Sequence, residues 1–446
     1  MMVSLLGVTM TLVGLFVHSY VYGNATSFLV IITPFVLFLL FLMQLNQKQV
    51  YLLNFAVFEA PHSWKVSHKD ICKIIRNLSS ERRRRGLPHH SDLDAQFQQK
   101  ILANSGTGDS TAWPPAIVQY ALFNESEGPR RTLQCMRHTR EEAETILFQC
   151  MDKLLEKTRV KPQKIDCLIV NCSIFSPTPS LCAMLCQKYG LSESVKTYNL
   201  SGQGCSASVI ATDLARDFLN ANSHSIAVVL STELISESIY HGHEKSMLIQ
   251  NTLFRSGGAA VMLTNKWYYF GASKYILHNL CRTQVSDEAA FKSVYETEDE
   301  EGNQGIALSK NITEVAGKAI EINLKTIAHK VLPIHEKIKV ALSIRKRNGK
   351  RKVTYTPHLK SAVQHLCIHP GGRAVLDTLQ QKLRLSDDDM KPSRHVLHKY
   401  GNTSSSSIWY ELDFLQREHN VKPGHKVLQL AFGSGFKCNS IVWKRL

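Results

Sequence analysis

Two long apolar segments open the chain, one from about Val3 to Tyr20 and one from about Ser27 to Leu45. Neither contains Lys, Arg, Asp or Glu, and each approaches the roughly 20 residues that an apolar helix needs to cross a bilayer. A secretory signal peptide would explain the first segment alone, but that segment lacks a basic start and a second, longer one follows it. The pattern therefore predicts two transmembrane helices that form a membrane anchor over residues 1–47.

The charges around these segments predict their orientation. The link between them, VYGNATS, carries no charge, whereas Lys48, Lys65, Lys69 and the run from Arg82 to Arg85 follow the second segment. Basic residues flank membrane helices on the cytosolic side. We therefore expect a hairpin that leaves the rest of the chain in the cytosol.

Beyond about Glu141, helix-like and strand-like segments alternate. The amphipathic stretch REEAETILFQCMDKLLEKT precedes the apolar run IDCLIVNCS, and the helix after Cys205 precedes the strand-like SIAVVLSTE. Continuous apolar strands separated by helices indicate a buried sheet covered by helices, which is an α/β fold. A similar succession follows Gly317 and ends in the hairpin-like HKVLQLAFGSGFKCNSIVWK.

The likeness of these successions predicts two related halves, residues 48–316 and 317–446. GQGCSASVIATDLA in the first half and YGNTSSSSIWYELDFL in the second both place glycine and small residues before an amphipathic helix. The shared pattern indicates an internal duplication. Chance similarity between two short stretches is the alternative.

Composition adds size and charge to this picture. The 446 residues are 44% hydrophobic and 20% charged, which is enough apolar material for a large core or two cores. The formal net charge of +16 favours a negative partner: nucleic acid, anionic lipid or a phosphorylated small molecule such as coenzyme A. The basic run SIRKRNGKRKVT lacks the interleaved aromatic residues of a nucleic-acid site, so we expect no nucleic acid. The run is a solvated loop or a docking site for anionic headgroups or coenzyme A phosphates.

The 11 cysteines are scattered through a chain that we expect to face the cytosol, where thiols stay reduced. Most are interpreted as small core residues. Cys182 and Cys186 lie four residues apart and fit one buried helix face better than a zinc site, so no metal is expected.

Cys205 differs from the other cysteines in its setting. It follows Gly202 and Gly204 and begins an apolar helix, where unpaired N–H groups and the helix dipole lower the pKa of a thiol and favour the nucleophilic thiolate. The small residues after it leave room for an acyl chain. Two interpretations are open: a nucleophile, or an inert cysteine packed beside two glycines.

Histidines near the predicted strand ends favour the nucleophile. HLCIHPGGRA places His365, Cys367 and His369 on one face of a strand. Further along, His398 precedes Asn402 by four residues, at the point of the second half that corresponds to Cys205. A cysteine, histidines and an asparagine at equivalent element ends point to a shared catalytic site.

Four motifs, NLSGQGCSASVIATDLA, CIHPGGRAVLD, GNTSSSSIWYEL and AFGSGFKCNS, closely resemble the 3-ketoacyl-CoA synthases of plants, the condensing enzymes of very-long-chain fatty acid elongation. The resemblance includes the membrane hairpin, VYLLNFAVFEAP and ILANSGTGDSTAWPPAI, and so covers nearly the whole chain. It implies a thiolase-type fold of two related α/β halves in five layers, preceded by the transmembrane hairpin.

The resemblance also implies residue roles. Cys205 would attack an acyl-CoA thioester and carry the acyl chain. His369 and Asn402 would donate hydrogen bonds to the thioester oxygen of malonyl-CoA, stabilising the enolate that forms as carbon dioxide leaves. Backbone N–H groups at Cys205 and Gly433 would hold the oxyanion of the second step. The product would be a 3-oxoacyl-CoA two carbons longer than the acyl-CoA.

Two more histidines, His365 and His398, match histidines that this family assigns to its active site, and we expect them to orient the groups that touch substrate. Because loss of the carboxyl group creates the carbanion, the reaction needs no metal or organic cofactor. Cys438 could serve as the second cysteine of a thiolase, but it lies in a strand-like stretch and is interpreted as a packing residue.

One departure from the family keeps an alternative open. Gln284 in RTQVSDEAA stands where the family usually has an active-site histidine, and glutamine cannot carry a proton or positive charge. The alternative is a catalytically weak homologue that regulates active elongase condensing enzymes by association. A soluble polyketide-type condensing enzyme is a third hypothesis, which the membrane hairpin disfavours.

The resemblance implies the remaining partners and the location. The substrates are acyl-CoA and malonyl-CoA, and the membrane is that of the endoplasmic reticulum, with the catalytic part facing the cytosol. We expect a homodimer, or a heterodimer with related synthases, and contacts with other elongase subunits.

Overall fold

The computed structural model describes residues 49–123, 135–347, 350–353 and 359–446. The predicted transmembrane hairpin at residues 1–47 lies outside them. Within the described ranges, no helix is long and apolar enough to cross a membrane. Residues 50–446 form one compact unit.

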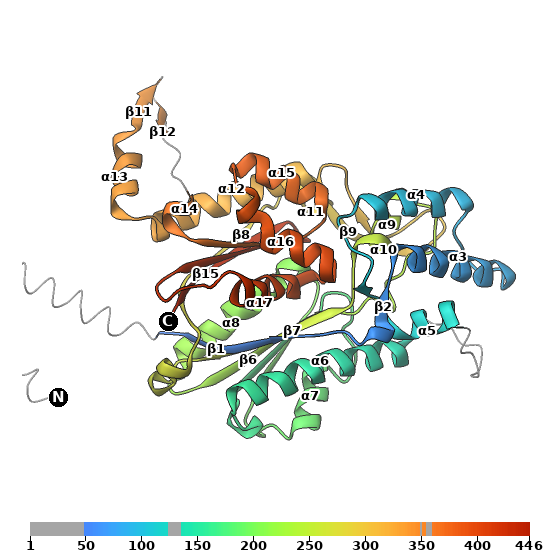
Figure 1. The fold of residues 1–446 in the computed structure, drawn as a ribbon, viewed down its shortest axis with the longest axis horizontal. Coiled ribbons are helices and arrows are strands. Elements are labelled where there is room, and N and C mark those ends of the chain that lie inside the picture. The colour runs from blue at the N-terminus through green and yellow to red at the C-terminus, as the bar shows by residue number, and fades with distance from the viewer. Residues whose placement is uncertain (1–48, 124–134, 348–349, 354–358) are drawn as a thin grey trace, which may run out of the picture. The chain divides into compact units, whose positions relative to one another are not determined.

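A sheet of nine strands runs through the unit, in the order β13-β14-β15-β8-β1-β7-β6-β4-β5. Figure 1 labels β15, β8, β1, β7 and β6 of this sheet. Its first group consists of β1 (Tyr51–Val57), β7 (Gly257–Thr264), β6 (Ile226–Glu233), β4 (Cys167–Asn171) and β5 (Lys196–Leu200). Its second group consists of β8 (Tyr275–Gln284), β15 (Lys437–Arg445), β14 (Lys426–Gly433) and β13 (His365–Ile368). The groups join where Tyr51 pairs with Ile276 and Leu52 pairs with Tyr275.

Both groups use the same pairing scheme. In the first group β4 and β6 are parallel while β6 and β7 are antiparallel, and in the second β13 and β14 are parallel while β14 and β15 are antiparallel. All residues of β4 and β6 are buried, as expected for strands covered on both faces. The predicted α/β fold is therefore confirmed.

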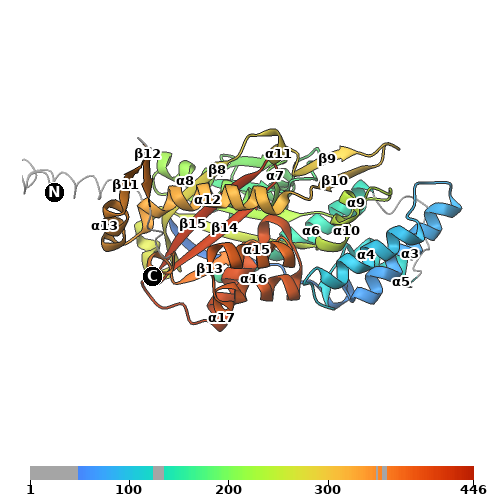
Figure 2. The same ribbon diagram turned by 90° about the horizontal axis from the view of Figure 1, so that it is seen from above.

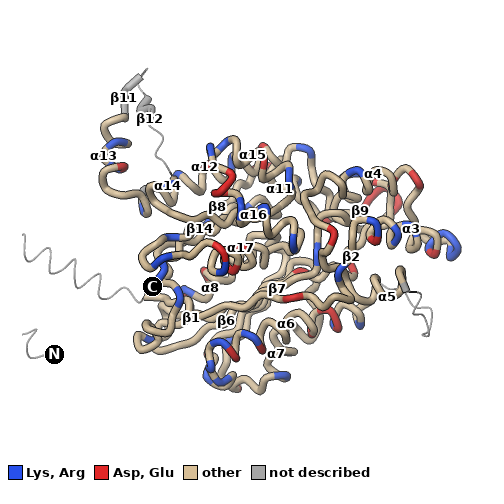
Figure 3. Tube along the Cα trace, in the orientation of Figure 1, with Lys and Arg blue, Asp and Glu red and all other residues tan. Residues whose placement is uncertain are grey.

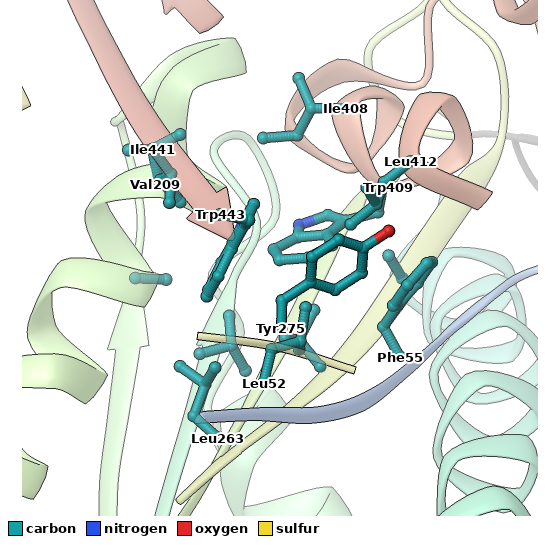
Figure 4. Close-up of a cluster of buried hydrophobic side chains, with 14 of the residues drawn as sticks. Leu52, Phe55, Val209, Leu263, Tyr275, Ile408, Trp409, Leu412, Ile441 and Trp443 are labelled. Carbon is teal, nitrogen blue, oxygen red and sulfur yellow. The ribbon is translucent and has the colours of Figure 1, made fainter. Parts of the chain in front are cut away.

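Three hydrophobic clusters separate the layers. Between the two groups of strands, α8 (Ala207–Ala221) and α17 (Ser407–Glu418) contribute to a central cluster that includes Phe55, Tyr275, Trp409 and Trp443 (Figure 4). On the outer face of the first group, a second cluster holds side chains of α6 (Met136–Thr158) and α7 (Leu181–Tyr189). On the outer face of the second group, a third cluster holds side chains of α12 (Ile312–Val331), α15 (Arg373–Leu383) and α16 (Asp387–Tyr400).

The predicted duplication is visible in the element boundaries. The short 3-10 helix η3 (Gly204–Ser206) precedes α8 and β6, and η5 (Ser404–Ser406) precedes α17 and β14. The residue numbers of η3 and η5, and of β6 and β14, differ by two hundred at both ends. Gly204 and Ser404 even share a positive φ, of 65° and 56°. The two halves therefore place equivalent turns at the ends of equivalent strands.

The boundary at residues 316 and 317 stays a prediction. β8 lies before this boundary in the sequence, and β15 lies after it. The two strands nevertheless pair along most of the length of β8. β8, which falls in the predicted first half, therefore belongs to the group of strands formed by the second half.

Smaller elements complete the unit. Next to the sheet, α3 (His68–Arg84), α4 (Asp92–Asn104) and α5 (Pro115–Phe123) lie side by side (Figure 2). Capping boxes at Ser67, Ser91 and Ser386 start α3, α4 and α16. The remaining elements are η1 (His62–Trp64), β2 (Lys65–Val66), β3 (Thr111–Ala112), η2 (Pro162–Lys164), α9 (Lys245–Leu248), α10 (Gln250–Leu253), η4 (Trp267–Ala272), α11 (Glu288–Phe291), β9 (Val294–Glu298), β10 (Gln304–Leu308), α13 (Ile334–Leu342), β11 (Ile344–Arg347), β12 (Lys350–Val353) and α14 (Leu359–Ala362).

Candidate active site

Cys205 lies where the backbone of η3 touches the end of β14. A Cβ atom added to Gly433 would lie 2.5 Å from the backbone nitrogen of Cys205, and one added to Gly204 would lie 2.6 Å from the backbone nitrogen of Ser434. These distances are too short for a side chain, so only glycine allows the two backbones to approach this closely. The sequence motifs around Cys205 and Gly433 therefore meet in space.

A chain of hydrogen bonds connects Cys205 to Ser404 and the buried Glu233. The hydroxyl of Ser404 lies 3.6 Å from the sulfur of Cys205 and 3.0 Å from Oε2 of Glu233. The other oxygen of Glu233 accepts hydrogen bonds from the backbone N–H groups of Ser173 and Ile174, both at 3.0 Å. Since a hydroxyl carries one proton, Ser404 donates to either the sulfur of Cys205 or Glu233 at one time. When it donates to Glu233, its oxygen can accept from the thiol.

The pKa of the Cys205 thiol contradicts the expectation from the helix N-terminus. Burial raises this pKa to about 12, a hydrogen bond from Ser404 opposes the increase, and the charge of Glu233 adds to it. Cys205 lies in η3, before α8 begins at Ala207, and the loss of water around the sulfur is the largest cause of the increase. The thiol is therefore protonated at pH 7 in the free protein.

His369 follows the last residue of β13 and is held by β14. Its backbone N–H donates to the carbonyl of Leu430 at 2.9 Å, and its ring packs against Phe432, with 5.4 Å between the ring centroids. The next residue along β14 is Gly433, which touches Cys205. Burial lowers the pKa of His369 to about 3, so the imidazole is neutral at pH 7. Its Nδ1 has no hydrogen-bond partner among the described residues.

Asn402 reaches the same place from the second half. Its side-chain oxygen accepts a hydrogen bond from the backbone N–H of Ser404 at 2.9 Å, and its backbone carbonyl accepts from the N–H of Arg255 at 2.9 Å. Because the side-chain oxygen is engaged, the NH₂ group is the part of the amide that can donate to a ligand. Ser404 thus connects Asn402, Cys205 and Glu233.

The structure does not bring His365 to Cys205. His365 pairs with Val427 on β14, six residues before Gly433, which corresponds to about 20 Å at roughly 3.3 Å per strand residue. Its Nε2 lies 3.0 Å from Nδ1 of His425 instead. β13 ends at Ile368, so His369 lies just beyond the strand, four positions after His365. The expected orienting role of His365 stays a prediction, which this separation does not support.

His398 also lies away from the residues that contact the thiol of Cys205. It is an exposed residue near the end of α16, its carbonyl accepts from the N–H of Gly108 at 2.8 Å, and its ring packs against that glycine. It lines a cavity of about 670 Å³ together with Lys65, Tyr400, Tyr410 and Arg417, among other residues. Its expected role in orienting the groups around Cys205 stays a prediction.

Three other positions singled out in the sequence have simple environments. Gln284 is exposed at the end of β8, opposite Lys437 on β15. Cys438 is buried in the outer cluster of the second half, where burial raises its pKa well above the usual value, in agreement with a packing role. Cys182 packs in the cluster under α6 and α7, as expected. Among the described residues, no group of His, Cys, Asp and Glu side chains could hold a metal ion.

Sequence reasoning missed Glu233 and Ser404. Glu233 is the last residue of the apolar strand β6, and its residue number is two hundred less than that of Gly433, so the two residues occupy equivalent strand ends. Ser404 is equivalent to Gly204 in the same way. The sequence did contain a signal for Glu233. It is a single acidic residue at the end of a buried strand, at the position equivalent to Gly433, for which an oxyanion role was expected.

Comparison with known proteins agrees with this geometry. Residues 42–349 match the family described as FAE1/Type III polyketide synthase-like protein, and residues 307–446 match the C-terminal domain of chalcone and stilbene synthases. Among solved structures, PKS-I from the brown alga Ectocarpus siliculosus superposes with a TM-score of 0.70 at 18% identity over 89% of this chain and 98% of that one. CsyB in complex with CoA-SH superposes with a TM-score of 0.68 at 19% identity over 89% of this chain and 100% of that one. The fold is thus the thiolase-like fold of type III polyketide synthases.

Sequence relatives are more specific. 3-Ketoacyl-CoA synthase 17 of Arabidopsis thaliana is 43% identical over 433 residues, which are 96% of this chain and 85% of the relative. 3-Ketoacyl-CoA synthase 5 of the same plant is 42% identical over 422 residues, 94% of this chain and 81% of the relative. The chain belongs to the family of 3-ketoacyl-CoA synthases, the acyltransferases that condense acyl units in fatty acid elongation.

Proposed function

We propose that this chain condenses a long-chain acyl-CoA with malonyl-CoA through an acyl-Cys205 intermediate, and releases a 3-oxoacyl-CoA two carbons longer, CO₂ and CoA. The observation that carries the proposal is the contact between η3 and the end of β14. It places the Cys205 thiol and its own backbone N–H beside Gly433, with Ser404 linking them to Asn402. Family membership supports the substrate class, since both substrates are CoA thioesters.

In the first step the sulfur of Cys205 attacks the thioester carbonyl of acyl-CoA. The thiol must lose its proton as the S–C bond forms, because burial keeps it protonated in the free protein. The Ser404 hydroxyl passes a proton to Glu233 while accepting the thiol proton, over the distances of 3.0 and 3.6 Å. Burial raises the pKa of Glu233, which makes its carboxylate a stronger proton acceptor than an exposed one. The proton leaves with the CoA thiolate, and Glu233 is ionised again.

In the second step malonyl-CoA loses CO₂ and its methylene carbon attacks acyl-Cys205. The electron pair of the broken C–C bond moves into the thioester, whose oxygen becomes negative and accepts hydrogen bonds from His369 and the NH₂ group of Asn402. A neutral imidazole suits this role, since it donates one hydrogen bond without an ionised partner. The backbone N–H groups at Cys205 and Gly433 hold the oxyanion that forms when the new C–C bond closes. Cys205 then leaves as the thiolate and takes up one proton from solvent, because its original proton left with CoA.

Residues outside the site support further parts of the proposal. The uncharged apolar segments within residues 1–47 would anchor the chain in the endoplasmic reticulum membrane with the catalytic part in the cytosol. β5 is the edge of the sheet and its Tyr198 is exposed, so a second copy or a related synthase could pair there. Other elongase subunits would meet the chain at this membrane.

The test separates the two half-reactions in membranes that contain the full-length protein. Asn402→Ala should still form acyl-Cys205, detected by mass spectrometry of the digested protein, but should release CO₂ from carboxyl-labelled malonyl-CoA about 10²–10³-fold more slowly. Cys205→Ala should lose the acyl adduct and the product. Normal CO₂ release by Asn402→Ala would contradict the enolate assignment. A folded wild-type protein that forms no product with any acyl-CoA would favour the regulatory alternative.

A further inference from the structure

One end of the sheet lies far from Cys205. Tyr51 pairs with Thr264 and Ile276, Ile276 pairs with Lys444, and Lys444 pairs with Lys426. These pairs form one row across the sheet, which we call the Tyr51 end. β14 runs from this row to Gly433, so the Tyr51 end is about 23 Å from the active site at roughly 3.3 Å per residue.

An aromatic turn, η4, protrudes at the Tyr51 end. Its Trp267, Tyr268 and Phe270 are 71%, 57% and 50% exposed. The ring of Phe270 packs edge-on against that of Tyr51, with 5.9 Å between the centroids. Three large exposed aromatic side chains within one turn are unusual on a surface that meets only water.

The helix α13 has its apolar face turned outward. Ile334, Ile338 and Leu342, spaced by four residues along one stripe, are 72%, 52% and 80% exposed. Glu336, in contrast, is buried and accepts a hydrogen bond from Lys339 at 2.8 Å. A helix of a water-soluble surface shows the opposite arrangement. α13 and the C-terminus lie at the end of the unit opposite α3, α4 and α5 in both views (Figures 1 and 2).

The surface between these apolar groups is basic. Burial lowers the pKa of Lys426, and the neighbouring positive charges of Lys444 and Lys337 lower it further, which shows that lysines of β14, β15 and α13 lie close together. Lys266 and Lys274 flank the aromatic turn. Figure 3 shows basic residues around the C-terminus and the start of β14.

The chain itself enters the unit at this end. Val50 precedes β1, and the apolar segment that ends near Leu45 is only five residues away. An extended link of that length reaches at most about 18 Å at roughly 3.6 Å per residue. If residues 1–47 are a membrane anchor, as proposed above, the Tyr51 end is therefore held close to the bilayer.

We propose that the Tyr51 end is a second membrane contact: the aromatic turn and the outward stripe of α13 insert at the headgroup level of a bilayer, and the lysines between them bind anionic headgroups. Tryptophan and tyrosine favour this interface because one side of each ring is apolar and the other polar. Lysines near an anionic surface are attracted to its headgroups. This contact fixes the orientation of the catalytic unit, with Cys205 turned away from the lipid.

Trp267 provides the test. All five tryptophans lie in the described part of the chain, and the other four, Trp64, Trp113, Trp409 and Trp443, are at most 6% exposed. Full-length protein is reconstituted into vesicles of phosphatidylcholine and phosphatidylserine whose acyl chains carry bromine, which quenches nearby tryptophan. The expected result is a loss of emission that the Trp267→Phe variant does not show.

Two variants in the Trp267→Phe background sharpen the test. A tryptophan introduced by Ile338→Trp should be quenched as well. A tryptophan introduced by Phe291→Trp should not be quenched: Phe291 is 52% exposed, but lies near Val294, whose carbonyl accepts from Ser434 at the active-site end. The proposal would be overturned if bromine left the tryptophan emission unchanged at positions 267 and 338. It would also be overturned if bromine quenched the emission at all three positions.

The lipid charge is tested in the same vesicles. The proposal requires weaker quenching at Trp267 when phosphatidylserine is replaced by phosphatidylcholine, and quenching that does not depend on charge would overturn the role of the lysines. Protection of Trp267 only in the presence of another protein would identify a protein interface and also overturn the proposal. Resistance to alkaline carbonate extraction reports on the anchor separately, so a failed anchor and a failed second contact are distinguishable.

Discussion

Gly433 sets the distance between the end of β14 and Cys205, and alanine at this position should disable the enzyme. A Cβ atom there would lie 2.5 Å from the backbone nitrogen and 3.2 Å from the Cα of Cys205. Both neighbours belong to the backbone, so no side chain can rotate away. An ordinary contact of about 3.5 Å requires the two segments to separate by about 1 Å.

A shift of this size at a reacting group costs about 10²-fold in rate, or about 2.7 kcal/mol of transition-state stabilisation. We therefore expect Gly433→Ala to slow acylation of Cys205 about 10²-fold, with 1–3 kcal/mol lost from the free energy of unfolding through overpacking, on the order of other such changes. The assay is the rate of CoA release when acyl-CoA is mixed with the membrane-inserted protein, followed by mass spectrometry of the Cys205 peptide.

Gly271→Ala is the matched control for the same chemical change. A Cβ atom at Gly271 meets nothing within 4 Å, so this variant should acylate at the wild-type rate. If Gly433→Ala also acylates at the wild-type rate, the close approach of β14 to Cys205 does not exist in the working enzyme, and the assignment of the oxyanion groups must be abandoned.

Three further changes test the site. Glu233→Gln removes a negative charge that raises the pKa of Cys205. Alkylation of Cys205 by iodoacetamide at pH 8 should therefore become faster, whereas acylation by acyl-CoA should become slower because the proton acceptor is lost. A change of both rates in the same direction would contradict the proton path. Ser404→Ala should slow acylation about 10-fold or more in stopped-flow measurements of CoA release, and an unchanged rate would exclude Ser404 from the proton path. Gln284→His should leave the alkylation rate of Cys205 unchanged, because Gln284 is exposed beside Lys437, and an increase in condensation would show that this position limits turnover.

The wild-type thiol has its own pH signature. Because burial raises the pKa of Cys205 to about 12, its alkylation rate should increase tenfold per pH unit from pH 7 to 10 without a plateau near the ordinary thiol pKa of about 8.5. A plateau below pH 9 would show that the helix N-terminus dominates after all.

Much of the fold could be predicted because the sequence repeats itself. The apolar strands, the helix after Cys205 and its counterpart after Asn402 follow directly from periodicity, and the structure places η3 and η5 before the equivalent helices α8 and α17. The motifs around Cys205 and Asn402 meet as the duplication suggested, and Gly433 lies beside Cys205 as the family resemblance implied. Local pattern and tertiary arrangement agree wherever one strand and one helix form the repeating unit.

Other features depend on contacts that local pattern does not contain. The pKa of Cys205 depends on its burial and on Glu233, which comes from another strand, so a rule about helix N-termini gave the wrong direction. His365 and His369 lie four positions apart in one motif, but only the register of β13 with β14 shows how far His365 lies from Gly433. Likewise, the outward stripe of α13 cannot be distinguished by periodicity from an ordinary helix that buries its apolar face.

The central claim is condensation through Cys205. The most direct measurement is mass spectrometry of the 3-oxoacyl products formed by membranes that contain the full-length protein, malonyl-CoA and a series of acyl-CoAs, beside membranes with Cys205→Ala. We expect products two carbons longer than the acyl-CoA supplied and an acyl adduct on Cys205, and we expect neither in the variant. The same products from the Cys205→Ala protein, or none from a folded wild-type protein with any acyl-CoA, would contradict it.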